Sequence, residues 1–272
     1  ACLVGSEMCI RDSAWSVAQK EQLAMNLRTS ASTEVGGAKQ QDVPLPPVHI
    51  VIAIDPLRVS PGGDLDYAWR VTQAAVQSGP EPQSPVSEGM REEVAAIDHL
   101  KGTARVSSRG LSLGVWIDPT SAVDSGATGQ MIEQVRQTLR DLAAPLPDED
   151  VGRGARWQKI TQLDARESLI AQTETFTLSA LQGERGTLDD VLAQTAPPQA
   201  LRGPGMDSTP ARMDSMLASG NSKVRFDLSR LVPQTRFDGT TTMVVSGRSP
   251  ADSTTRVTMI MRIGIDIEGT TQ

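Results

Sequence analysis

Hydrophobic and polar residues alternate near the end of the chain. Apolar side chains occupy every second position of residues 257–267, and most positions between them are polar or charged. Because successive side chains of a β-strand point to opposite faces, this pattern predicts a strand with one buried and one wet face, as in antiparallel sheets. We expect Met259, Met261, Ile263 and Ile265 to point into a dry interior.

The same alternation predicts strands earlier in the chain. They fall at residues 65–71, 111–117 and 224–228, and another strand begins near Trp157. Residues 48–55 are almost continuously apolar, which predicts a central strand that is covered on both faces. Residues 60–64 read SPGGD and predict a turn.

Two segments change to the period of a helix. Apolar residues recur at i, i+4, i+8 and i+11 as Met131, Val135, Leu139 and Leu142. Pro145 is the expected end of this helix. The pattern also predicts a shorter helix at residues 90–100, for which Gly102 supplies the exit, and a helical turn near residues 213–217.

These elements together predict a mainly β protein of the α+β class. We expect antiparallel curved sheets in two β-rich halves around a central amphipathic helix. Residues 14–125 form the first half, and residues 126–272 form the helix and the second half. The alternative is one continuous meandering sheet that carries its helices on one face.

Composition excludes several classes of function. The net charge of −7 and the pI of about 5.0 oppose binding to nucleic-acid phosphates, and the aromatic content of 3% leaves few side chains for stacking on bases. No apolar run approaches the roughly 18 residues of a membrane-spanning helix. The sequence therefore predicts no nucleic-acid partner and no transmembrane span.

A catalytic serine motif is present only in part. Residues 110–114 read GLSLG, which matches the G-x-S-x-G pattern of a nucleophile elbow. An elbow needs a strand, a sharp turn and a helix, with the histidine downstream. Ser112 instead lies inside a predicted strand, and both His49 and His99 precede it. We therefore expect no hydrolase triad of this kind.

Metal and cofactor sites are not expected either. Residues 148–150 (DED) lack the spacing of a calcium loop and predict a charged turn. Residues 189–190 (DD) are expected at a turn or at the start of a helix. Residues 152–154 (GRG) lack the third glycine and the helix of a dinucleotide site. Two histidines are too few for a zinc cluster.

The first residues of the chain carry a resemblance of a different kind. Residues 2–13, CLVGSEMCIRDS, resemble one translated reading frame of the transposon-end adapter used to prepare sequencing libraries. We therefore treat residues 1–13 as a non-native tail, which removes Cys2 and Cys9 from the chemistry. We expect the native N-terminus, with any export signal, to be missing.

A second resemblance concerns residues 145–157, PLPDEDVGRGARW. This block resembles the signature of an uncharacterised family of bacterial exported proteins and lipoproteins, in which a similar block follows a helix. Residues 223–233 and the strand before Trp116 are also similar to strands of that family. The resemblance implies an extracytoplasmic location, in the periplasm or as a membrane-anchored lipoprotein, and it implies no particular activity.

The same block has a structural interpretation. Pro145 and Pro147 stop the helix, and Gly152 and Gly154 permit unusual backbone angles. Trp157 then packs the chain back into the core. The block is therefore expected to form a helix-to-strand corner.

We expect a non-catalytic bacterial cell-envelope protein with a binding or structural role. The candidate site for a lipid or other apolar ligand is the helix face of Met131, Val135, Leu139 and Leu142, although these residues also suit an ordinary core. Other envelope proteins are the expected protein partners. Two alternatives stay open: a hydrolase with a noncanonical serine or carboxylate site, and a scaffold of the cell envelope.

Overall fold

In the part of the chain that the structure describes, the fold is a large β-sheet with two helices. The computed structural model describes residues 10–35, 38–39, 42–77, 85–119, 127–165, 168–201, 211–248 and 254–271. The strands are β1 (Glu21–Val35), β2 (Ala38–Lys39), β3 (Val43–Pro44), β4 (Val48–Val59), β5 (Leu65–Val76), β6 (Lys101–Val106), β7 (Ser112–Ile117), β8 (Arg156–Ala165), β9 (Ser168–Gln182), β10 (Arg185–Ala196), β11 (Gln199–Leu201), β12 (Ala211–Asp227), β13 (Gln234–Arg248) and β14 (Thr254–Thr271). The helices are α1 (Pro85–Ala95) and α2 (Ala127–Arg140).

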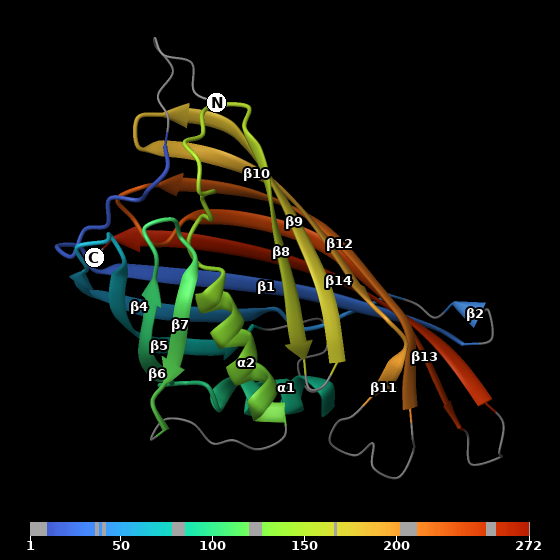
Figure 1. Ribbon diagram of the computed structural model, residues 1–272. Coiled ribbons are helices and arrows are strands. Elements are labelled where there is room, and N and C mark those ends of the chain that lie inside the picture. The colour runs from blue at the N-terminus through green and yellow to red at the C-terminus, as the bar shows by residue number, and fades with distance from the viewer. Residues whose placement is uncertain are drawn as a thin grey trace.

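All of these strands belong to one antiparallel sheet. The main order is β7-β6-β5-β4-β1-β14-β13-β12-β10-β9-β8, while β2 and β3 pair with β1 and β11 pairs with β12. The sheet is open, because its two edge strands, β7 and β8, do not pair with each other. In Figure 1 the sheet is strongly curved, and α2 lies between these two edges.

This architecture confirms the predicted mainly β, antiparallel fold class. The two β-rich halves are parts of one continuous sheet, joined where β1 pairs with β14 from Glu21–Thr271 to Val35–Val257. The alternating segment 257–267 lies within β14, and the predicted long helix is α2. No helix among the described residues is long and apolar enough to cross a membrane.

The larger core lies on the face of the sheet against which α1 and α2 pack, which we call the inner face. Alternation along β1, β4 and β5 directs Leu23, Ile52 and Trp69 into this core, where each is at most 2% exposed. Val94 of α1 and Val135 of α2 belong to the same cluster. Removal of these apolar surfaces from water is what holds the helices to the sheet.

A smaller core lies under β9, β10 and β12, around Leu178 and Leu188. The segment between α2 and β8 closes this core with Val151, whose carbonyl accepts a hydrogen bond from the backbone N–H of Ile10 at 2.9 Å. Ile10 is buried, so this residue of the expected tail is packed in the structure. Residues 1–9, with both cysteines, lie outside the described residues.

Two local predictions are wrong. Gly102 is not a helix exit but a residue of β6; α1 ends at Ala95, and His99 takes the left-handed backbone angle (φ 70°) in the turn that follows. Residues 213–217 are not helical but lie in β12. A β-bulge after Met213 puts Met213 and Met216 on one face of the strand, although they are three residues apart.

Candidate functional site

The predicted ligand face lies inside the larger core, along α2 and, for Leu142, just after the helix ends at Arg140. Val135, Leu139 and Leu142 are at most 3% exposed, and Met131 is half-buried and packs against the same cluster. The hydroxyl of Tyr67 on β5 donates to the carbonyl oxygen of Leu139 at 3.5 Å. These four side chains therefore pack against the sheet, and their role in ligand binding stays a prediction.

The block from Pro145 to Trp157 forms the connection from α2 to β8. The backbone N–H of Gly154 donates to the carbonyl of Leu178 at 2.7 Å, and Gly154 has the positive φ of 86° that glycine tolerates, whereas Gly152 does not. Trp157 is half-buried and stacks on Phe176 with ring centroids 5.9 Å apart. Pro145 and Pro147 are half-buried in the same connection.

The serine motif has no histidine beside it among the described residues. Ser112 begins β7, after a turn in which Gly110 has φ 76°. His49 Nδ1 lies 2.8 Å from Asn26 Oδ1, and His99 is exposed beside Asp98. The carboxylate of Asp148 is exposed and pairs with Arg109. Neither histidine is placed to act as a base for Ser112.

Five apolar side chains lie side by side on the inner face of β12, β13 and β14. Met216 pairs with Met243, which pairs with Met259. Met261 and Ile263 continue the same face of β14, because alternate residues of a strand share a face. We call these five residues the methionine patch.

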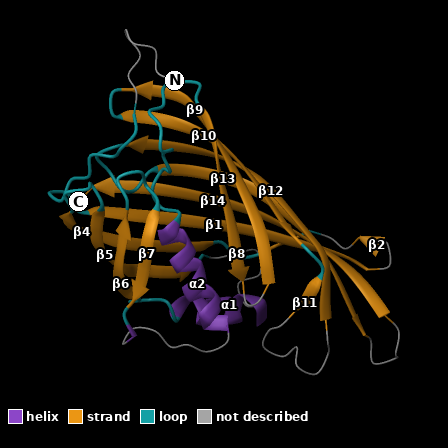
Figure 2. Ribbon diagram, in the orientation of Figure 1, coloured by secondary structure: helices purple, strands orange, loops and turns teal. Residues whose placement is uncertain are grey.

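The methionine patch extends the inner face beyond the larger core. Ile265 and Ile267 of β14 have the same phase and pack against that core, so the patch points to the same side. None of its members belongs to either core cluster of the described residues, and all five are half-buried. The helices contact chiefly β5 and β7, and in Figure 2 the strands β12–β14 extend past them.

An aromatic ring borders the methionine patch. The ring of Phe237 lies against Gly220 and Gly239, where an added Cβ would come 2.4 Å and 2.5 Å from ring atoms. Glycine at both positions lets the ring lie flat on the backbone. Phe237 pairs across the sheet with Ser222, which leads to a group of charged residues on the next strands.

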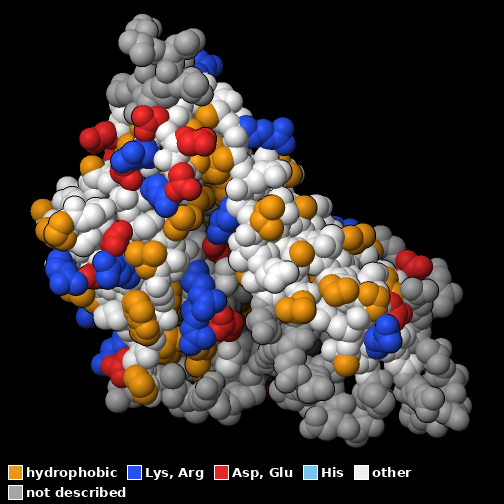
Figure 3. Space-filling model, in the orientation of Figure 1, with side chains coloured by type: hydrophobic (Ala, Val, Ile, Leu, Met, Phe, Trp, Pro, Cys, Tyr) orange, Lys and Arg blue, Asp and Glu red, His pale blue; other side chains and the backbone are white. Residues whose placement is uncertain are grey.

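This charged cluster consists of Asp141 after α2, Lys159 of β8, Glu174 of β9, Asp190 of β10 and Ser222 of β12. Lys159 Nζ lies 2.8 Å from Asp141 Oδ1 and 3.3 Å from Glu174 Oε2. The hydroxyl of Ser222 donates to Asp190 Oδ2 at 3.1 Å. The cluster thus ties the end of α2 to the sheet, and Figure 3 shows charged side chains gathered over α2 and beside β8.

Asp190 is the most unusual member of the charged cluster. It is 7% exposed, and its Oδ1 has no hydrogen-bond partner among the described residues. Burial raises the pKa of Asp190 to about 6, and the charge of Glu174 adds to this rise. For Lys159, burial alone would lower the pKa, but Asp141 and Glu174 raise it above its ordinary value.

The charged cluster was missed in the sequence. Residues 189–190 were expected at a turn or a helix start, which is wrong, since both lie inside β10. The sequence offers one indication of the cluster in β8. Lys159 comes two residues after Trp157, so both side chains point to the inner face of the sheet. Among the described residues, no group of three or more histidine, cysteine, aspartate or glutamate side chains is arranged to hold a metal ion.

Comparisons with known proteins add no family to this geometry. No protein-family model matches the chain, and no curated protein matches it. The relation of residues 145–157 to exported bacterial proteins therefore stays a prediction from resemblance.

Proposed function

We propose that this chain is a non-catalytic binding protein that holds the apolar chain of a lipid-like amphiphile against the methionine patch. We also propose, from the resemblance of residues 145–157, that it works outside the cytoplasm as an exported or lipid-anchored bacterial protein. The observation that carries the binding proposal is an apolar stretch of inner face that belongs to neither core.

The chemistry of the methionine patch suits a flexible apolar ligand. Methionine side chains are unbranched and polarisable, so they adapt to ligands of different shape. A contiguous apolar surface that stays partly open to water is typical of a binding site. The charged cluster lies on the same face, starting on β12 itself and continuing on β10, β9 and β8, and it gives an amphiphile a polar region for its head group.

The test uses 11-(dansylamino)undecanoic acid, whose fluorescence rises when it leaves water. The variant Met261→Glu places a charge in the methionine patch. The control Ile260→Glu places the same charge one residue earlier, on the outer face of the same strand, at a position that is also half-buried. Both variants are compared with the wild type in urea unfolding, so that a loss of folding is separated from a loss of binding.

We expect the probe to bind the wild type and the Ile260→Glu protein alike. Met261→Glu should weaken probe binding roughly ten- to hundredfold, because one large apolar side chain no longer buries its surface against the probe. Equal loss in both folded variants, or no binding of the probe to the wild type, contradicts the proposal.

A further inference from the structure

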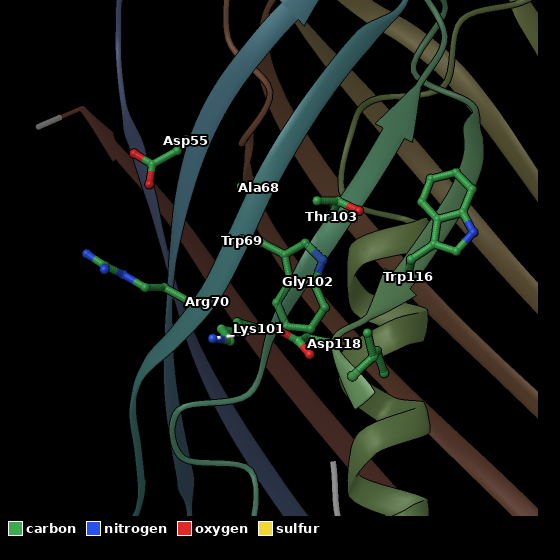
Figure 4. Close-up of a pocket in the computed structure, with 10 residues that line it drawn as sticks. Asp55, Ala68, Trp69, Arg70, Lys101, Gly102, Thr103, Trp116 and Asp118 are labelled. Carbon is green, nitrogen blue, oxygen red and sulfur yellow. Dashed lines mark ion pairs between the residues drawn. The ribbon is translucent and has the colours of Figure 1, made fainter. Parts of the chain in front are cut away.

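The outer face of the N-terminal half of the sheet carries a hollow that the proposed function does not use. It has a volume of about 380 Å³ and is lined by residues of β4, β5, β6 and β7 and by the residue after β7 (Figure 4). Successive cross-strand partners, Asp55, Ala68, Thr103 and Trp116, form a row across it. We call it the outer hollow.

The outer hollow exists because small side chains lie between large ones. Ala68 and Thr103 occupy the two middle strands of the row. Gly102 lies beside them, and an added Cβ there would come 1.9 Å from the carbonyl oxygen of Trp116. In Figure 4, Arg70 stands on one side of this floor and Trp116 on the other. The shape is therefore fixed by side chains on four paired strands.

Trp116 provides a flat aromatic surface at the edge of the outer hollow. Its side chain is 55% exposed, although indole is among the most costly groups to leave in water. The ring rests on Gly114, where an added Cβ would come 2.5 Å from ring atom Cη2. One face of the indole is thus covered by backbone, and the rest of the ring remains open for a ligand.

Among the residues that the structure describes, the charges around the outer hollow leave one cation without an ion-pair partner. Asp55 pairs with Lys20 at 2.8 Å, and Lys101 pairs with Asp118 at 3.6 Å. Arg70, the cross-strand partner of Lys101, is exposed and forms no ion pair with any described residue. A guanidinium binds a carboxylate through two parallel hydrogen bonds, so Arg70 suits an anionic group.

We propose that the outer hollow binds an acidic oligosaccharide, with one sugar ring on Trp116 and the carboxylate of another sugar unit on Arg70. A pyranose has an apolar C–H face that stacks on indole and a rim of hydroxyl groups. The rim hydroxyls match the hydroxyl of Thr103 and the carboxylates of Asp55 and Asp118, which line the same hollow. This site lies on the opposite face from the methionine patch and does not depend on it.

The test is calorimetric titration of the whole protein with trigalacturonic acid, with monomeric galacturonic acid and with neutral maltotriose. We expect trigalacturonic acid to bind at least tenfold more tightly than maltotriose. Much weaker binding of the monomer supports the proposal, because a single sugar cannot reach both Trp116 and Arg70. Binding of the monomer as tightly as the trimer contradicts the proposal. Equal affinity for the acidic and neutral trimers overturns it.

Two variants and two controls locate the site. Trp116→Ala should weaken trigalacturonic acid at least tenfold, and Arg70→Gln should remove the preference over maltotriose. The controls are Leu113→Ala, an exposed apolar residue of the same strand, and Arg225→Gln, an exposed arginine on β12, and both should bind like the wild type. Unchanged binding in folded Arg70→Gln, or no saccharide binding to the wild type at millimolar concentration, refutes the proposal.

Discussion

Replacement of Asp190 by asparagine should stabilise the protein at neutral pH. Asp190 is 7% exposed, and its pKa rises from 3.8 to about 6 because burial disfavours its charged form. Asparagine has nearly the same shape and stays neutral at every pH. It also retains an oxygen to accept the hydrogen bond from Ser222.

The size of the effect follows from the shift in pKa. Because the pKa of the folded state lies above that of the unfolded state, folding favours the protonated form of Asp190. The stabilisation that the protonated Asp190 gives to the folded state is fully present below pH 3.8 and is lost as the pH rises through about 6. A shift of this size corresponds to about 3 kcal/mol of unfolding free energy at neutral pH.

Urea unfolding of wild type and variant at pH 4.5, 5.5, 6.5 and 7.5, followed by tryptophan fluorescence, measures this contribution. The difference between Asp190→Asn and wild type should grow in favour of the variant by about 2 kcal/mol from the lowest to the highest pH. Comparison with the wild type at each pH cancels the titration of the other carboxylates.

Asp189→Asn is the matched control on the outer face of the same strand. Hydrogen bonds from Lys223 and from Ser179 lower the pKa of Asp189. Asp189→Asn should therefore not become more stable than the wild type as the pH rises. A difference between Asp190→Asn and wild type that stays constant from pH 4.5 to 7.5 would refute the account of Asp190. A gain of the same size in Asp189→Asn would refute it as well.

Two further predictions concern stability at neutral pH, measured by the same urea unfolding. Gly110→Ala should lower the free energy of unfolding by about 2–5 kcal/mol, because Gly110 has φ 76° and an added Cβ would come 2.2 Å from the carbonyl oxygen of Ala144. Gly154 has a similar φ of 86° but open space around an added Cβ, so Gly154→Ala should lower it by only about 1 kcal/mol. Equal losses of stability in the two glycine variants would mean that the backbone angle alone sets the loss. Glu21→Ala should lower the free energy of unfolding by about 2–4 kcal/mol, because the buried carboxylate accepts hydrogen bonds from the backbone N–H groups of Leu231 and Val232 at 2.8 Å and 3.0 Å. A loss below about 1 kcal/mol would show that water takes the place of the carboxylate as acceptor.

Hydrophobic periodicity was sufficient to place long, regular elements. Residues 257–267 carry an apolar side chain at every second position, and they lie in β14 as predicted. The bulge after Met213 could not be predicted, because it depends on pairing with β13 and leaves a helical spacing in the sequence. Periodicity identifies faces of strands but not which strands are neighbours.

The charged cluster and the outer hollow depend on which strands are neighbours, and for this reason the sequence alone did not predict them. Lys159 and Asp190 come together only because β8, β9 and β10 pair in their observed register. The outer hollow likewise needs Ala68 to face Thr103, and Thr103 to face Trp116. Polar residues in the inward phase of a strand, such as Lys159, are the signal that a sequence does offer.

The pairing of β1 with β14 has a consequence for how this protein is made. Leu23 meets Gly269 across the sheet, so the seam between the two halves joins residues separated by most of the chain. During synthesis β1 presents a bare hydrogen-bonding edge until β14 has been translated, and contacts so distant in sequence form slowly. The nascent protein is therefore most exposed to aggregation at the stage when its first half has folded and its closing strand is still inside the ribosome.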